Sequence, residues 1–217
     1  MTQPRRRVIP DATIARLPVY HRTLSDFDAQ RRETVSSDQL AEHAGVNAAQ
    51  VRKDLSYFGT YGTRGVGYGV KGLLVEIQTE LGLTQEWKCV IVGAGNLGMA
   101  LAKFGGFTER GFTVVGVVDV DATKVGVDLG NVIVEHQDRL EDIVHDHGIT
   151  IGIVTTPPHA AQDAADRLVN VGIQSILNFA PVILDVPFGV QVRDVDVAVE
   201  LQILAFHEQR RGAASEN

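Results

Sequence analysis

The chain contains little cysteine and no long apolar segment. Cys89 is the only cysteine among 217 residues, so no intramolecular disulfide can form, and a reducing cytoplasmic environment is expected. No apolar run approaches the ~20 residues that a membrane-spanning helix needs, so no membrane association is expected. The N-terminal stretch MTQPRRRVIPDATIARL is basic but lacks the apolar core and cleavage site of a signal peptide. With 44% apolar and 22% charged residues, the composition is typical of a globular protein.

An excess of positive charge is also lacking. The formal net charge is −7, which by itself argues against nucleic-acid binding. The charges are unevenly distributed, however, because residues 1–80 contain 11 Lys and Arg against 9 Asp and Glu, whereas the remainder contains 9 against 18. This asymmetry indicates that a nucleic-acid-binding module, if present, lies in the first 80 residues of the chain.

A helix is expected near the start of the chain. Apolar residues recur at helical spacing from Ile14 to Phe27, and Asp11 is the expected N-cap. Because proline fixes φ and lacks an N–H donor, Pro18 predicts either a kink or a late start of this helix.

Two short helices joined by a three-residue turn are expected next. Ser36 and Gln39 form a capping box ahead of the first helix, which ends at Gly45. Asn47 is the expected cap of the second helix. Such a pair is typical of a helix-turn-helix.

The second helix of the pair has an apolar stripe and a polar, basic face. Val51, Leu55 and Phe58 recur at helical spacing and are expected to be buried. Long hydrogen-bond donors on the opposite face suit base edges and phosphates in a DNA major groove. The residues expected to face outward and contact DNA are Gln50, Arg52, Lys53, Ser56 and Tyr57. A helix that merely presents a solvated face is the alternative.

The stretch GTYGTRGVGYGV predicts a glycine-rich hairpin after these helices. Arg64 and Gly65 lie near its expected tip. Arginine at such a tip can enter a narrow minor groove, where negative potential is concentrated. Helices followed by a hairpin indicate a winged-helix domain.

Residues 89–119 carry the pattern of a dinucleotide-binding unit. An apolar strand leads into Gly93, Gly95 and Gly98, which form G-x-G-x-x-G ahead of an apolar helix. A second strand ends at Asp119, where a carboxylate is expected to bind the adenosine ribose hydroxyls. Its charge would repel a 2′-phosphate, so NAD(H) is favoured over NADP(H). A glycine-rich turn that binds nothing is the alternative.

Strand and helix patterns continue to alternate up to Pro181, which predicts a parallel, doubly wound sheet. Ligands of such sheets bind at the carboxyl ends of the strands, and the nicotinamide half is expected near the last strand ends. The residues expected to contact the cofactor are Gly93, Ala94, Gly95, Asn96, Leu97, Gly98, Asp119, Val120, Lys124, Thr155, Thr156, Pro157, Asn178, Ala180 and Pro181.

The segment DVDVAVELQILAFHEQRR predicts a last helix with an apolar face. Val197, Leu201 and Leu204 share that face. The sheet is expected to be complete before this helix, so its apolar face packs either on a partner chain or on its own domain.

Motifs of both halves occur in the order found in one known family. The stretches VRKDLSYFG, GTRGVGY, IVGAGNLG, VDVDATKVG and ILNFAPV, with the closing helix, resemble the Rex family of redox-sensing transcriptional repressors over about residues 12–207. We expect an α/β chain with a winged-helix DNA-binding domain (1–82), a Rossmann NAD(H)-binding domain (83–190) and a C-terminal dimerisation helix and tail (191–217). The resemblance implies a homodimer that swaps this helix, binds an inverted-repeat operator in double-stranded DNA, and releases it when NADH replaces NAD⁺.

The resemblance also implies roles for individual residues. Those similar to the DNA and dinucleotide contacts of the family are Arg52, Lys53, Arg64, Gly65, Gly93, Gly95, Gly98 and Asp119. A redox switch is implied around Asp196, at the start of the last helix, and Arg22, which this acid can engage across the dimer. Phe104 stands where relatives have a tyrosine of the same network, and Val197 stands where relatives have a phenylalanine.

A small NAD-dependent dehydrogenase is the alternative function. No substrate domain remains once the N-terminal module is assigned to DNA, and the seven histidines lack a convincing catalytic setting. His159 is the best general-base candidate. His145 and His147 diverge on a helix, so no metal site is expected. The chain is therefore interpreted as a regulator without catalytic residues. A plain NAD-binding oligomerisation module would leave the basic helix and hairpin unexplained.

Overall fold

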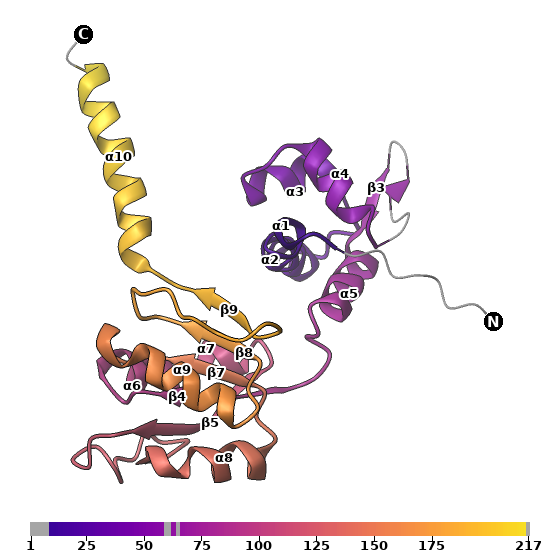
Figure 1. Ribbon diagram of the computed structural model, residues 1–217. Helices are drawn as coiled ribbons and strands as arrows, with labels where there is room; N and C mark the ends of the chain where they lie inside the picture. Colours follow the sequence, from indigo (N-terminus) through magenta and orange to yellow (C-terminus); the bar gives the residue numbers. More distant parts are fainter. Residues whose placement is uncertain (1–8, 59–61, 64–65, 216–217) are drawn as a thin grey trace. The chain divides into compact units, whose positions relative to one another are not determined.

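The computed structural model describes residues 9–58, 62–63 and 66–215, with side chains described as far as residue 212. The chain divides into two compact units, Met1–Gln85 and Glu86–Asn217 (Figure 1). Each unit has a hydrophobic core of its own, as expected of separate domains. Within the described ranges, no helix is both long and apolar enough to span a bilayer.

The first unit combines helices with a small antiparallel sheet. Its elements in chain order are α1 (Asp11–Ile14), α2 (Leu17–Ala29), β1 (Thr34–Val35), α3 (Ser37–Ala44), α4 (Ala48–Leu55), β2 (Gly62–Thr63), β3 (Gly67–Gly69) and α5 (Val70–Glu80). β2 and β3 pair as the expected hairpin, and β1 pairs with the other side of β3. The helix-turn-helix followed by a hairpin confirms the predicted winged-helix arrangement.

Local capping explains where the two central helices begin and end. Ser36 Oγ accepts a hydrogen bond from Gln39 N at 3.1 Å, and Gln39 Oε1 accepts one from Ser36 N at 2.9 Å, so the predicted capping box is confirmed. Asn47 Oδ1 accepts from Gln50 N at 2.8 Å at the start of α4. Gly45 ends α3 with a φ of +65°, in the left-handed region that favours glycine.

The first predicted helix is divided into two. α1 ends at Ile14 and α2 begins at Leu17, with Pro18 in its first turn, so the late start predicted from this proline is confirmed. The predicted N-cap is wrong. Pro10 already has the extended φ and ψ of an N-cap, so Asp11 lies inside the first turn of α1.

Apolar side chains from α2, α3, α4 and α5, with Val35 of β1, form the core of this unit. Val51 and Leu55, predicted to be buried, are at most 1% exposed, whereas Phe58 is only partly buried. Burying a side chain of this size contributes about 1.5–3 kcal/mol. Helix α5, which was not predicted from the sequence, adds Val70, Leu73 and Ile77 to the core.

The second unit is a doubly wound parallel sheet. Its elements are β4 (Trp87–Val92), α6 (Asn96–Ala102), α7 (Gly105–Thr108), β5 (Phe112–Asp119), β6 (Val134–His136), η1 (Gln137–Arg139), α8 (Leu140–His147), β7 (Ile151–Val154), η2 (Pro158–Ala160), α9 (Ala161–Asn170), β8 (Ser175–Asn178), β9 (Gln191–Asp194) and α10 (Val197–Ser215). The strand order is β6-β5-β4-β7-β8-β9, and all neighbouring strands are parallel. The order reverses between β4 and β7, where sheets of this kind bind ligands.

Successive side chains of β4 enter two different cores. Cys89 and Ile91 pack in a cluster with α6, whereas Val90 and Val92 pack in a cluster with α8 and α9. Helices therefore cover both faces of the sheet, which confirms the predicted Rossmann architecture. The sixth strand, β9, was not predicted.

The apolar side chains of α10 are not buried. Their exposed fractions lie between 44% and 64% for Val197, Val199, Leu201, Ile203, Leu204 and Phe206. These exposures contradict the expectation that α10 covers its own domain. Extended exposed apolar surface commonly marks an interaction site, so packing on a partner chain stays a prediction.

Candidate functional sites

A pocket opens at the carboxyl edge of the parallel sheet, at the ends of β4, β5 and β7. Its volume is about 560 Å³. The predicted cofactor residues that line it are Gly93, Gly95, Asn96, Leu97, Asp119, Val120, Lys124, Thr155, Thr156 and Pro157. The predicted residues that do not line it are Ala94, Gly98, Asn178, Ala180 and Pro181. The sequence prediction thus brought together residues of three strand ends, which the sheet places around one cavity.

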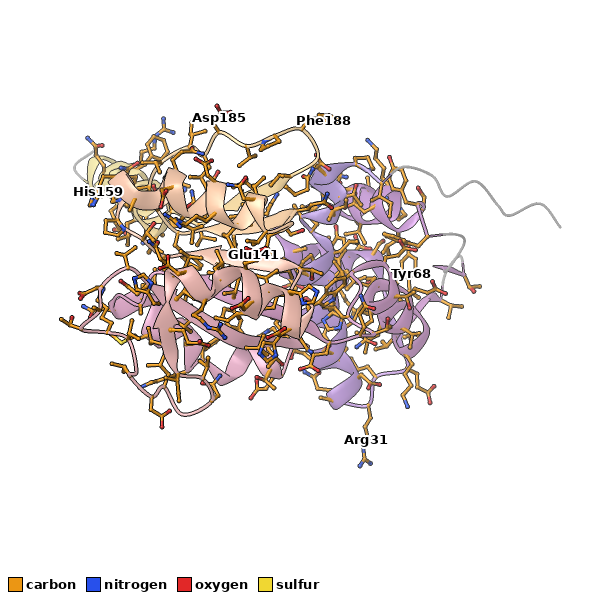
Figure 2. All side chains as sticks on the ribbon, turned by 60° about the horizontal axis from the view of Figure 1, so that its bottom comes forward. Arg31, Tyr68, Glu141, His159, Asp185 and Phe188 are labelled. Atoms are coloured by element: carbon orange, nitrogen blue, oxygen red, sulfur yellow. The ribbon has the colours of Figure 1, made fainter. Side chains whose placement is uncertain are left out.

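One wall of the pocket was missed by the sequence analysis. His159, Asp163 and Arg167, from η2 and α9, line the pocket together with Gln137. His159, the general-base candidate near the cofactor edge, is exposed just before α9 (Figure 2). The signal was present in the sequence, because the helix that follows a strand end at this edge must begin beside the ligand.

The three glycines of the turn have different roles. Gly93 has a φ of +108°, and a Cβ at this position would lie 2.9 Å from the carbonyl carbon of Thr155. A Cβ on Gly98 would lie 2.0 Å from the carbonyl oxygen of Gly93, so both residues are required by packing. A Cβ on Gly95 would meet no atom within 4 Å. The space beside Gly95 in the pocket wall is therefore open to a ligand, as close approach of a pyrophosphate requires.

Asp119 supplies an ionised carboxylate at the end of β5. Its Oδ2 accepts hydrogen bonds from Ala94 N at 2.6 Å and Lys124 Nζ at 3.0 Å, and its Oδ1 accepts one from Asp121 N at 2.8 Å. Burial raises the pKa of this carboxyl, but these hydrogen bonds outweigh burial and hold the pKa below its usual value. Because each carboxylate oxygen accepts about two hydrogen bonds, Oδ1 can accept one more from a ligand.

Two threonines at the end of β7 complete this side of the pocket. Thr155 Oγ1 donates to the carbonyl oxygen of Gly93 at 2.7 Å and so ties the two strand ends together. Thr156 Oγ1 is buried and has no hydrogen-bond partner within the described part of the chain. A buried hydroxyl without a partner is costly, so this atom is suited to a polar group of a ligand.

Asn178 explains why the end of β8 does not line the pocket. The side chain is fully buried, and its Nδ2 donates to Ala180 O at 3.1 Å, Val182 O at 2.9 Å and Asp194 Oδ1 at 2.8 Å. Its Oδ1 accepts from Ala180 N at 2.9 Å. The amide therefore joins the chain after β8 to the end of β9.

Helix α4 presents two cations on the outer face of the helix-turn-helix. Arg52 and Lys53 are both exposed. Arg52 Nη1 donates to Ser37 Oγ at 2.9 Å, at the start of α3. Ser56 is exposed, with its Oγ donating to Lys53 O at 2.7 Å, and Tyr57 is partly exposed. These four predicted contacts thus lie in the last turn of α4 or directly after it.

The hairpin lies close against the rest of its small sheet. A Cβ on Gly67, whose φ is +97°, would lie 2.4 Å from the carbonyl oxygen of Val35. Glycine at this position therefore lets β3 approach β1. The two predicted wing contacts, Arg64 and Gly65, lie outside the described residues.

The inner face of α4 carries a buried acid that the sequence analysis did not predict. Asp54 is 0% exposed. Its Oδ2 accepts from Arg16 Nε at 2.6 Å and Tyr20 Oη at 2.8 Å, and its Oδ1 accepts from Thr13 Oγ1 at 3.0 Å, Arg16 Nη2 at 2.8 Å and Gln50 Nε2 at 2.8 Å. The expectation that Gln50 faces outward is therefore wrong, because its amide turns toward this carboxylate. An acid three residues after Val51, on the apolar stripe, was the available signal.

The three predicted switch residues lie in different units. Arg22 is exposed on α2, in the first unit. Asp196 precedes α10 in the second unit, where its Oδ1 accepts from Ala198 N at 2.9 Å. Phe104 is 52% exposed and packs edge-on against Phe107, with ring centroids 5.3 Å apart.

The described residues contain no group of three or more His, Cys, Asp and Glu side chains that could hold a metal ion. His145 is 90% exposed on α8, as predicted for a surface histidine. Burial raises the pKa of Cys89 to about 11, so this thiol is protonated and unreactive at neutral pH.

Comparisons with known proteins agree with this division into two units. The family described as "Putative DNA-binding protein N-terminus" matches residues 8–56, and the family described as "CoA binding domain" matches residues 84–182. The redox-sensing transcriptional repressor Rex of Streptomyces griseus is 56% identical over 207 residues, which cover 95% of this chain and 82% of the relative. Rex of Pelotomaculum thermopropionicum is 50% identical over 199 residues, covering 92% and 93%.

Solved structures of a Rex-family repressor, RSP, are similar over almost the whole chain. RSP in complex with β-NADH has a TM-score of 0.87 and 34% identity, covering 97% of this chain and 99% of that one. RSP in complex with β-NAD⁺ and operator DNA has a TM-score of 0.88 and 35% identity, covering 97% of both chains. By its sequence and its fold, this chain belongs to the Rex family of redox-sensing transcriptional repressors.

Proposed function

We propose that this chain binds operator DNA through its first unit and NAD(H) through its second, and that NADH weakens its binding to DNA. The observation that carries the proposal is the combination of the open glycine turn and ionised Asp119 with a capped helix-turn-helix on the same chain. The solved structures of RSP with NADH, and with NAD⁺ and operator DNA, support this assignment.

The residues of the pocket fit a dinucleotide. The open space beside Gly95 takes the pyrophosphate, Asp119 Oδ1 accepts from the adenosine ribose, and Thr156 Oγ1 pairs with a polar group of the cofactor. Lys124 holds the carboxylate of Asp119 in place. The ionised carboxylate disfavours a 2′-phosphate, so NAD(H) is preferred over NADP(H). The wider predicted set, including Asn178, Ala180 and Pro181, stays a proposal.

DNA is bound by the exposed end of α4. Arg52 and Lys53 contact bases and phosphates in the major groove, and Ser56 and Tyr57 add contacts to the backbone. Arg64 and Gly65 of the hairpin contact the minor groove. Gln50 contributes by holding Asp54 rather than by reaching DNA.

The working form is a homodimer in which α10 is swapped between subunits. The exposed apolar face of α10, which includes Leu201 and Leu204, supports this because a partner chain would bury it. Two DNA-binding domains related by a twofold axis match an inverted-repeat operator, whose half-sites are then about 34 Å, or a multiple of this distance, apart. Leu201→Asp should convert the dimer to monomers in analytical ultracentrifugation, and an unchanged sedimentation coefficient would contradict this role of α10.

Asp196, Arg22 and the region around Phe104 are proposed to respond to the oxidation state of the nicotinamide ring. The nicotinamide ring is cationic when oxidised and neutral when reduced. Asp196 is proposed to exchange between this charge and the guanidinium of Arg22, so the cofactor biases the dimer through its differential affinity for two arrangements. The side chain of Phe104 has no hydroxyl, so the proposed exchange relies on the acid and the arginine.

The chain acts in the cytoplasm and does not catalyse a reaction. The first unit is assigned to DNA, which leaves no substrate domain for a dehydrogenase, and His159 is exposed at the pocket wall. Incubation with NAD⁺ and common alcohols, aldehydes and acids should yield no NADH. Turnover with any of them would favour the dehydrogenase alternative.

The direct test is an operator titration. An inverted-repeat duplex, enriched from a random library by the protein itself, is titrated at fixed salt with NADH, NAD⁺ or neither. The proposal predicts tight binding with NAD⁺ and weak binding with NADH. Equal affinities under all three conditions would show that the proposed sensing function is wrong.

A further inference from the structure

The buried acid of α4 is unexpected beneath a DNA-binding surface. Asp54 is 0% exposed and lies on the same helix as Arg52 and Lys53. The negative charge of Asp54 offsets the positive charge of Arg16, whose Nε lies 2.6 Å away, so the pair as a whole adds no attraction for phosphates. The presence of this acid therefore calls for a role that a neutral residue does not fill.

Four of the five hydrogen bonds to Asp54 come from the α1–α2 segment, residues 11–29. Thr13 lies on α1, Arg16 lies at the joint between α1 and α2, and Tyr20 lies on α2. Gln50 adds a donor from α4 itself. Five hydrogen bonds converge on one carboxylate, more than its roughly four acceptor sites usually receive, so the group is saturated.

These bonds supply a constraint that the apolar core lacks. Burial of Val51 and Leu55 determines which face of α4 is inward. Apolar packing is not directional, however, so small rotations and shifts of α4 cost little free energy. The two bonds from Arg16 form a planar fork with both oxygens of Asp54, which fixes orientation as well as distance. Base recognition requires placement within about 0.5 Å, a precision that directional bonds provide.

The outer face of α4 is held as well. Arg52 Nη1 donates to Ser37 Oγ at 2.9 Å, which links α4 to the start of α3. α4 is thus attached on its inner face to α1 and α2 and on its outer face to α3. The charged network also favours the ionised acid, since its hydrogen bonds outweigh burial and keep the pKa of Asp54 below the usual value.

We propose that Asp54 is a positioning residue for operator recognition, which locks α4 to the α1–α2 segment and so sets the orientation in which Arg52 and Lys53 meet the bases. This inference rests on the proposed function of α4 as the DNA-contacting helix. It has a consequence for signalling, because α2 also carries Arg22. A displacement of α2 would be passed to α4 through Tyr20 and Arg16 rather than absorbed between the helices.

The test separates positioning from folding through two DNA probes. The affinity of the full-length protein with NAD⁺ is measured for the enriched inverted-repeat duplex and for a scrambled duplex of the same length, well below the melting temperature. Non-specific binding depends mainly on phosphate charge, whereas operator binding also needs aligned base contacts. Partial unfolding would weaken both affinities together, so the ratio of the two reports on positioning.

Asp54→Asn is expected to lower the operator-to-scrambled ratio about tenfold, the effect of losing one good base contact. Asp26→Asn is the matched control, because Asp26 is exposed on α2 and the substitution removes the same charge. The control should leave the ratio unchanged and tighten both complexes slightly. Electrostatics alone predicts that Asp54→Asn behaves like the control, and that result would overturn the inference.

Tyr20→Phe provides a second variant in case Asp54→Asn fails to fold. It removes a single hydrogen bond from the carboxylate and keeps the ring in the core, and it should lower the ratio about two- to threefold. An unchanged ratio would overturn the inference even if the melting temperature fell. Affinity for NADH without DNA should stay unchanged in all variants, and failure of the wild-type protein to bind any duplex would instead refute the proposed function.

Discussion

The two units of the chain each bury one aspartate among several hydrogen-bond donors, and they use it differently. Asp54 in the first unit is enclosed by donors from other side chains, and the carboxylate is saturated. Asp119 in the second unit is held by two backbone N–H groups and Lys124, and it lines a pocket. The pKa of both acids is lowered by these bonds.

The difference indicates how to distinguish a structural acid from a ligand-binding one. Side-chain donors from α1, from the α1–α2 joint, from α2 and from α4 itself occupy the whole acceptor capacity of Asp54. Backbone donors at a strand end leave Asp119 Oδ1 with capacity facing the pocket. A buried carboxylate is thus a candidate ligand-binding group when it lines a cavity and can still accept a hydrogen bond. It is a candidate for positioning a helix when all its acceptor sites are occupied by protein donors.

Removing each carboxylate tests this comparison most strongly. Asp54→Ala should lower the free energy of unfolding of the first unit by about 3–5 kcal/mol, because it leaves the buried Tyr20 hydroxyl and the partly buried Arg16 without their partner. Asp119→Ala should cost less stability but abolish measurable NADH binding. Urea unfolding and NADH fluorescence check the two outcomes. Equal losses of stability with NADH binding retained in both variants would contradict the distinction.

The glycines of the turn sharpen the same distinction within the second unit. Gly98→Ala should destabilise the unit by at least about 2 kcal/mol, because its Cβ would lie 2.0 Å from a backbone oxygen. Gly95→Ala should leave stability unchanged but weaken NADH about tenfold or more, because the added methyl group occupies the pyrophosphate space. Gly105→Ala, where a Cβ meets nothing within 4 Å, serves as the control. The idea fails if Gly95→Ala binds NADH as tightly as the control.

Acid should weaken the contribution of Asp54. Because its folded pKa lies below the ordinary value of 3.8, its contribution to stability is present above that pH and is lost as pH falls through the folded pKa. The stability difference between wild type and Asp54→Asn should therefore be constant from pH 7 to about pH 5 and shrink below about pH 4. Thermal unfolding over this range measures it. A difference that grew on acidification would reverse the assigned sign.

The smallest expected effect concerns backbone conformation. Arg31 is the only non-glycine residue with a positive φ, +58°, among the described residues, and its side chain extends away from the fold (Figure 2). Arg31→Gly should raise the stability of the first unit by about 0.5–1 kcal/mol, since glycine adopts this region without strain. Thermal unfolding with Arg32→Gly as a control measures the gain. Arg32 lies over the Phe27 ring at 4.6 Å, so the control should lose stability instead.

Much of the fold could be predicted from local signals. The helix-turn-helix could be predicted because its signals, the capping box of Ser36 and Gln39 and the turn glycine Gly45, act within a few residues. The spacing from Gly98 to Asp119 is set by one strand–helix–strand unit, so Asp119 could also be predicted from the sequence as a cofactor-binding acid. Such features depend on neighbours along the chain.

The remaining features depend on partners far along the chain or lack a local signal. Asp54 is joined to residues 34 to 41 positions away, which no periodicity reveals. Helix α5 begins after Gly69 without a side-chain cap, and Gly72 interrupts its pattern. Strand β9 lies at the sheet edge and is largely polar and exposed, so it lacks the apolar run of a buried parallel strand.

The central claim is that the two units are energetically coupled, and reciprocity tests it most directly. The affinity for NADH is measured with and without the enriched operator duplex, and the affinity for the duplex is measured with and without NADH, at one salt concentration. The account predicts that each ligand weakens the other by the same factor, and a factor of ~100 would correspond to about 2.7 kcal/mol of coupling. NADH affinity that is the same with and without bound operator would contradict it.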